Sequence, residues 1–157
     1  MNQRHGLAIA TLEEIIKTIK ESKELTSNHI RVLHNLLNST LLDALNLIDT
    51  QSVIKVNCGT KNKRSIFVVI EKNTVKHDDI VGGDDDTNKR GYYLCYLTPR
   101  HCPCKSFLHS VICDQSTLIC KHILACILYD ALDYTTPSIN MDEERFAELL
   151  FLQTLPS

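Results

Sequence analysis

Three cysteines and one histidine form the pattern in this chain that most clearly suggests chemistry. Cys102 and Cys104 are separated by one residue, fifteen residues follow, and Cys120 and His122 are again separated by one residue. Three thiolates and an imidazole suit tetrahedral Zn²⁺, with bonds of about 2.3 Å to sulfur and about 2.0–2.1 Å to nitrogen. Because protein atoms would fill all four positions and leave none for water, the pattern predicts one structural zinc ion rather than a catalytic one.

An extended segment and the start of a helix would bring these two pairs together. Residues two apart in an extended segment point the same way, so Cys102 and Cys104 can both reach one ion, and the proline between them stiffens the segment. Two residues within a helix are separated by about 200° of rotation, so Cys120 must lie at or just before the first turn if it is to converge with His122. The sequence therefore predicts a helix from Cys120 to about Leu132, whose N-terminus favours the thiolate that metal binding requires.

Other cysteines and histidines leave alternatives open. Three nearby residues could each replace one of the four ligands, although an ordinary loop role is the simpler interpretation: His101, His109 and Cys113. Buried free thiols are the alternative to a metal site as a whole. Cys95 and Cys126 occur in apolar patterns and are expected in the core, whereas Cys58 is expected in a turn.

The N-terminal third has the periodicity of helices. Apolar residues recur every three or four positions over residues 1–50, which predicts three short helices. The expected N-caps are Thr11, which would form a capping box with a glutamate three residues later, then Ser27, and then Ser39 or Thr40.

The period then changes to that of strands. β-branched and aromatic residues predict strands over 53–57, 65–71 and 92–98. Between the last two, residues 72–91 lack regular pattern, and a stretch of this length predicts an extended, mobile loop inserted into a hairpin. Residues 51–132 are therefore expected to form the zinc-binding region.

The C-terminal region, 133–157, is expected to contain a last helix from Asn140 to about Gln153. Together these elements predict an α+β fold: N-terminal helices, a small antiparallel hairpin or sheet, and a zinc knuckle followed by C-terminal helices. All three regions are expected to form one compact domain, since 157 residues are enough to bury one core.

Composition and charge narrow the class of protein. The chain is 43% hydrophobic and 23% charged, close to the averages for globular proteins, and no apolar run is long enough to span a bilayer. The N-terminus lacks the apolar stretch of a signal peptide, so we expect a soluble intracellular protein. Seven cysteines in such a protein favour metal binding over disulfides. The net charge of −2 argues against a general binder of duplex DNA.

The C-x-C and C-x-H pairs resemble the SWIM zinc-binding module, whose ββα character agrees with the predicted strand, knuckle and helix. Ala125, three residues after the histidine, matches a small residue found in many members. From about Leu41 to Leu128, the chain also resembles the small SWIM subunits of Shu complexes. The loop over 72–91 is longer than the usual hairpin connection of that family.

The resemblance implies a function. Family members pair with RecA-type recombinase paralogues, as a heterodimer or in a larger complex, and promote homologous recombination. It also implies a location in the nucleus. The closed metal site and the lack of a second catalytic constellation in the sequence predict a non-enzymatic scaffold subunit, and the lack of a long apolar run predicts no membrane partner. The chain also lacks the G-x-x-x-x-G-K-[ST] phosphate loop, so it cannot be the ATPase member of such a complex.

Two further functional hypotheses come from the residues. Direct binding of single-stranded DNA is an alternative, because four aromatic residues between 92 and 107 interleave with basic candidates for nucleic-acid contact: Arg90, Arg100 and Lys105. An apolar stripe in the last helix is a candidate partner-binding surface, with an intramolecular core as the competing interpretation: Phe146, Leu149 and Leu150. SWIM modules also occur in transcription and ubiquitin-pathway adaptors, which gives a third class.

Overall fold

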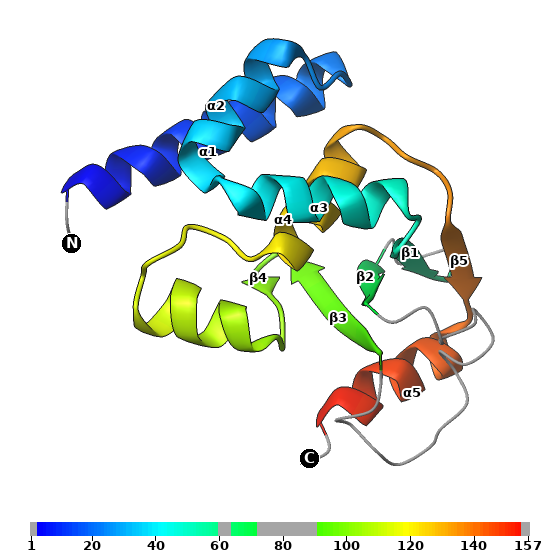
Figure 1. Cartoon of the computed structure of the whole chain (residues 1–157). Coiled ribbons are helices and arrows are strands. Elements are labelled where there is room, and N and C mark those ends of the chain that lie inside the picture. Colours follow the sequence, from blue (N-terminus) through cyan, green and yellow to red (C-terminus); the bar gives the residue numbers. More distant parts are fainter. Residues whose placement is uncertain (1–2, 60–63, 72–90, 155–157) are drawn as a thin grey trace.

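A five-stranded sheet lies between two layers of helices in the computed structural model, which describes residues 3–59, 64–71 and 91–154 (Figure 1). The helices are α1 (Gln3–Ser22), α2 (Ser27–Leu37), α3 (Ser39–Asp49), the π-helical segment η2 (Phe107–Cys113), α4 (Lys121–Ala131) and α5 (Glu143–Thr154). The strands are β1 (Val53–Cys58), β2 (Arg64–Ile70), β3 (Tyr92–Leu97), β4 (Arg100–His101) and β5 (Ser138–Met141). The predicted α+β class is confirmed.

The strands are ordered β4-β3-β2-β1-β5. Neighbouring strands from β1 to β4 pair antiparallel, which agrees with the antiparallel arrangement predicted for the strands that correspond to β1, β2 and β3. β5 pairs parallel with β1, so that Val56 lies beside Ile139, and the sheet is mixed. The structure therefore adds two edge strands that the sequence did not predict, β4 and β5.

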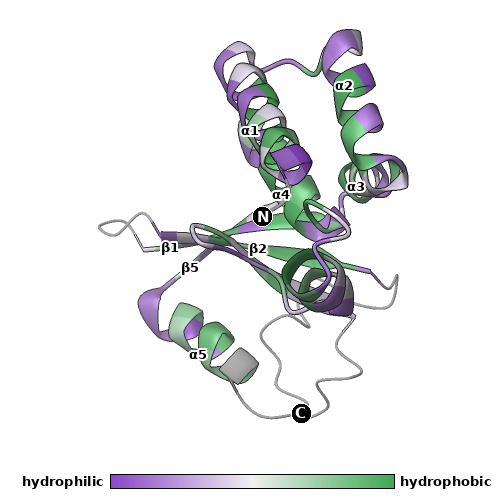
Figure 2. Cartoon of the chain, turned by 90° about the vertical axis from the view of Figure 1, so that its left-hand side faces the viewer, coloured by the Kyte–Doolittle hydropathy of each residue, from purple (hydrophilic) through white to green (hydrophobic). Residues whose placement is uncertain are grey.

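The two faces of the sheet are both covered, which explains the continuous apolar runs in its central strands. Side chains of β1, β2 and β3 alternate between two hydrophobic clusters. The first face carries Val53, Phe67, Val69 and Cys95 and packs against α1 to α4. The opposite face carries Ile54, Val56, Val68 and Leu94 and packs against α5 (Figure 2).

Helix α4 is the centre of the first layer. Every residue from His122 to Tyr129 is buried, because α1, α3 and β3 all contact the helix. Such a helix is apolar on all sides and cannot slide or rotate without disrupting the core. The first turn of α4 is therefore a rigid support for Cys120 and His122.

The first two helices begin earlier than the sequence predicted. α1 already starts at Gln3, so Thr11 lies inside the helix, where its hydroxyl donates a hydrogen bond to the Leu7 carbonyl at 2.9 Å. The capping box predicted at Thr11 is wrong, because the preceding residues continue the helix. α2 is capped one residue before the predicted serine: the Thr26 hydroxyl accepts from the His29 amide, and the His29 ring accepts from the Thr26 amide, both at 3.3 Å.

Two later helix starts also differ from prediction. The N-cap of α3 is Asn38 rather than Ser39 or Thr40, and its φ of 49° reverses the chain between α2 and α3. Asn140 does not cap the last helix, because it lies in β5. The carboxylate of Asp142 instead accepts a hydrogen bond from the Arg145 amide at 2.8 Å and caps α5.

The loop predicted over residues 72–91 lies outside the described residues except for Gly91. Its two ends meet at a backbone hydrogen bond of 2.9 Å from the Glu71 amide to the Gly91 carbonyl. None of the helices in the described part of the chain is long and apolar enough to cross a membrane.

Candidate metal centre

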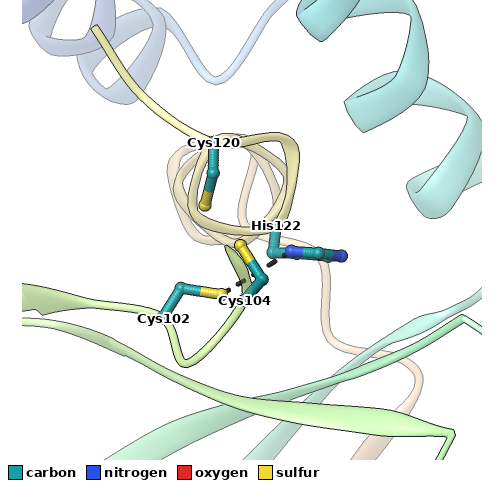
Figure 3. A group of neighbouring side chains, drawn as sticks. All are labelled: Cys102, Cys104, Cys120 and His122. Carbon is teal, nitrogen blue, oxygen red and sulfur yellow. Dashed lines mark hydrogen bonds between the residues drawn. The ribbon is translucent and has the colours of Figure 1, made fainter. Parts of the chain in front are cut away.

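The four predicted ligand residues converge on one point beneath the first turn of α4 (Figure 3). Cys102 and Cys104 come from the segment after β4, whereas Cys120 and His122 come from the start of α4. Their ligand atoms all lie within 4.8 Å of one another, and all four residues are buried. Within 3–59, 64–71 and 91–154, this is the one group of three or more such side chains that could hold a metal.

The spacing of two of these atoms matches a tetrahedral zinc site. Cys102 Sγ lies 3.6 Å from His122 Nδ1. An ion with zinc–sulfur and zinc–nitrogen bonds of ordinary length at the tetrahedral angle would hold a sulfur and a nitrogen about 3.6 Å apart. The donor set also suits zinc, since thiolates and imidazole are its preferred ligands in structural sites. The cluster therefore fits a zinc site in which the histidine presents Nδ1.

Backbone amides support two of the sulfur atoms. Cys120 has an extended backbone and is the N-cap of α4, as the two-residue spacing predicted, and its Sγ accepts from the Ile123 amide at 3.5 Å. Cys104 Sγ accepts from the Phe107 amide at 3.3 Å, where η2 begins. These donors favour thiolates, because they point partial positive charge at the sulfur atoms.

The three sulfur atoms shift one another's pKa values. Hydrogen bonds from Cys102 and Cys120 lower the pKa of the Cys104 thiol despite its burial. The pKa values of Cys102 and Cys120 are raised, first because each thiol bonds to a neighbouring sulfur and also because burial disfavours the charged form. A bound dication would favour the thiolate at all three, since metal binding to thiols releases protons.

Two residues that the sequence did not single out surround His122. Glu71, just after β2, accepts a hydrogen bond from His122 Nε2 at 2.9 Å, and the Tyr93 ring lies over the imidazole with 4.5 Å between ring centres. The alternation of side chains along β2 could have indicated Glu71. Phe67 and Val69 face the first hydrophobic cluster, which also contains the metal-ligand cysteines, and Glu71 follows Val69 by two positions and therefore points to the same face. Partial burial would raise the pKa of Glu71, but hydrogen bonds from Lys121 and His122 outweigh it and leave the pKa below its ordinary value.

The alternative ligands lie outside the cluster. His101 is exposed and lies near the rings of Tyr96 and Phe107, while His109 and Cys113 are exposed on η2. Cys95 and Cys126 are buried core residues, as predicted, and Cys58 is also buried in the core. The expectation for Cys58 is wrong, because this residue ends β1 and is only 4% exposed.

The candidate nucleic-acid residues are not gathered by the structure. Arg90 lies outside the described residues. Arg100 pairs with the carboxylate of Glu13 on α1, and Lys105 is exposed just after the second ligand cysteine. The described structure therefore brings the metal-ligand candidates together but not the candidates for nucleic-acid contact.

The candidate partner-binding stripe requires a correction. Phe146 and Leu149 are only 4% and 3% exposed, because they pack against the second face of the sheet. Leu150 is partly buried against the same cluster. The burial of Phe146 and Leu149 contradicts an exposed docking stripe that includes them and agrees with the competing interpretation of the stripe as intramolecular core.

Relatives of the chain carry names that agree with the cluster. A human protein named "Zinc finger SWIM domain-containing protein 7" is 22% identical over 142 residues, which cover 90% of this chain and 88% of that protein. The Danio rerio protein of the same name is 28% identical over 127 residues, covering 81% and 78%. A Dictyostelium discoideum homolog of that protein is 23% identical over 147 residues, covering 92% and 83%.

No family model and no solved structure matches the chain. The matched shares of this chain, 81–92%, nevertheless extend well beyond the Cys/His motif. The chain is similar to proteins of this name over most of its length, and its Cys/His cluster fits a zinc site. The predicted resemblance to SWIM-type zinc finger proteins is thus confirmed.

Proposed function

We propose that the chain binds one structural Zn²⁺ ion through Cys102, Cys104, Cys120 and His122. The observation that supports this is the convergence of three sulfurs and one ring nitrogen, all buried, from two segments of the chain. When bound, the ion would tie the segment after β4 to the first turn of α4. All four coordination positions are taken by protein atoms, so the metal supports a surface rather than a reaction.

On this framework the chain acts as a non-enzymatic scaffold subunit of a Shu-type complex in the nucleus. It pairs with a RecA-type recombinase paralogue and promotes repair by homologous recombination. Support comes from the resemblance to SWIM-type proteins over most of the chain. It also comes from a site with four protein ligands, the arrangement expected of a structural rather than a catalytic zinc ion. Direct binding of single-stranded DNA has less support, because one of its three basic candidates is paired with Glu13.

A co-purification experiment tests the scaffold role. A candidate RecA-type recombinase paralogue from the same genome is co-expressed with the tagged chain, with the variant Cys104→Ser and with the control Cys113→Ser. Cys113 is an exposed cysteine outside the cluster, so its substitution matches the chemical change without touching the site. We expect the paralogue to co-purify with the wild type and the control, and to be lost with Cys104→Ser together with the zinc.

The same proteins separate the scaffold from the DNA hypothesis. Affinity of the isolated chain for single-stranded DNA, falling steeply with salt, would favour direct nucleic-acid binding. Failure of the intact, zinc-loaded chain to retain any candidate paralogue would overturn the scaffold proposal. Equal retention by wild type and a folded, zinc-free Cys104→Ser would show that the metal site is not needed for pairing.

A further inference from the structure

The carboxylate of Glu71 contacts the outer side of the candidate metal centre. Its Oε1 lies 2.9 Å from His122 Nε2, the ring nitrogen opposite the sulfurs, and also pairs with Lys121 Nζ. The His122 side chain is only 3% exposed, whereas that of Glu71 is 28% exposed. Glu71 thus contacts the Nε2 side of a buried ring whose Nδ1 side faces Cys102.

The geometry assigns a direction to the imidazole. Nδ1 faces Cys102 Sγ at 3.6 Å, so it is the nitrogen available to a metal, and it must be unprotonated to bind one. A neutral ring with an unprotonated Nδ1 carries its proton on Nε2. The Glu71 carboxylate then accepts a hydrogen bond from this N–H group. Without that acceptor, the Nε2 proton of a buried ring would lose its partner.

Other contacts hold Glu71 and the ring in place. The Glu71 amide donates to the Gly91 carbonyl, which fixes the end of β2, and the ring of Tyr93 covers one face of the imidazole. Lys121 adds a positive charge beside the cluster, which would be negative overall with zinc bound, because three thiolates would outweigh one Zn²⁺. The carboxylate is therefore placed by backbone and charge rather than by the histidine alone.

We propose that Glu71 is the positioning residue of the zinc site, which orients His122 through Nε2 so that Nδ1 binds the metal. This inference rests on the zinc site proposed above and adds a residue 51 positions away from the ligand that it orients. Outer hydrogen-bond partners of metal-binding histidines typically contribute about 10- to 100-fold to metal affinity. We expect that range for Glu71→Ala.

Competition with a chelator of known zinc affinity measures the effect on the full chain. The variants are Glu71→Ala, Glu71→Gln and the control Glu148→Ala, which removes an exposed glutamate on α5. Zinc affinity should fall about 10- to 100-fold for Glu71→Ala and remain unchanged for the control. Glu71→Gln should recover most of the loss, because its amide oxygen still accepts from Nε2. Affinity within twofold of wild type for Glu71→Ala, or equal losses for Ala and Gln, would overturn the assignment.

A second measurement on the zinc-loaded wild type does not depend on any variant folding. Nitrogen-15 NMR of the histidine rings should show His122 bound to metal through Nδ1 and protonated at Nε2. Metal on Nε2 would overturn the positioning role of Glu71 while leaving zinc binding itself intact. A wild-type chain that binds no zinc at all would instead overturn the zinc proposal and this inference together.

Discussion

Arg100 donates hydrogen bonds from Nη1 and Nη2 to the two carboxylate oxygens of Glu13, at distances of 2.5 and 3.0 Å. The two residues are 87 positions apart, and their pairing joins α1 to the short strand just before the first ligand cysteine. This bidentate contact links the N-terminal helices to the segment that carries Cys102 and Cys104.

The energy of that pair should be small. Both side chains are partly exposed, at 35% and 47%, and exposed ion pairs typically contribute about 0–1 kcal/mol. A double-mutant cycle with Arg100→Ala and Glu13→Ala, followed by urea denaturation, should give a coupling energy below about 1 kcal/mol that falls with added salt. A coupling of several kcal/mol would mean that the contact is far better shielded from water than its exposure indicates.

Leu149 should contribute strongly to stability. It is 3% exposed between α5 and the sheet, so Leu149→Ala should lower the free energy of unfolding by about 2–5 kcal/mol. The matched control is Leu42→Ala on α3, where the side chain is 57% exposed and the expected change is within about 0.5 kcal/mol. Equal effects of the two substitutions in denaturant unfolding would contradict the packing of α5 on the sheet.

Removal of zinc should loosen one layer of the molecule before the other. The ligands hold the first turn of α4 to the segment after β4, whereas α5 packs on the opposite face of the sheet. After chelation, backbone amides of residues 102–131 should therefore lose their protection from hydrogen exchange first. Amides of α5 should lose less protection. Loss beginning in α5, or none at all, would contradict a metal that supports α4.

Added zinc should raise the melting temperature through the same contacts. A ligand that binds only the folded chain stabilises it by about 2.7 kcal/mol at one hundred times its dissociation constant. The melting temperature of Cys120→Ser should be independent of zinc, because this variant lacks the sulfur that both caps α4 and joins the cluster. A wild-type melting temperature that does not respond to zinc would contradict the linkage.

Local spacing made the four cluster residues predictable. C-x-C in an extended segment and C-x-H at a helix start are short-range patterns, and the structure places Cys120 at the N-cap of α4 as that argument required. Glu71 was not found, because its contact with His122 spans 51 residues and depends on how β2 packs against α4. The alternation along β2 indicates which face of the sheet Glu71 lies on. It does not indicate which helix covers that face, so the contact with His122 could not be predicted.

Other differences arise from tertiary packing. Four residues of β5 gain strand structure by pairing with β1, which a weak local pattern does not reveal. Phe146 looked suited to docking because the helix pattern does not show which surface covers it, and the second face of the sheet does so. Thr11 matched a capping box, yet α1 already begins at Gln3. The backbone N–H groups after Thr11 therefore bond to carbonyls of the preceding helical turn and need no side-chain cap.

The central claim is that one ion joins Cys102, Cys104, Cys120 and His122. X-ray absorption at the zinc edge, combined with metal analysis of the purified chain, tests it most directly. We predict one zinc per chain with three sulfurs at about 2.3 Å and one nitrogen at about 2.0–2.1 Å. A folded chain that contains no metal, or a bound zinc with any other ratio of sulfur to nitrogen, would contradict the account.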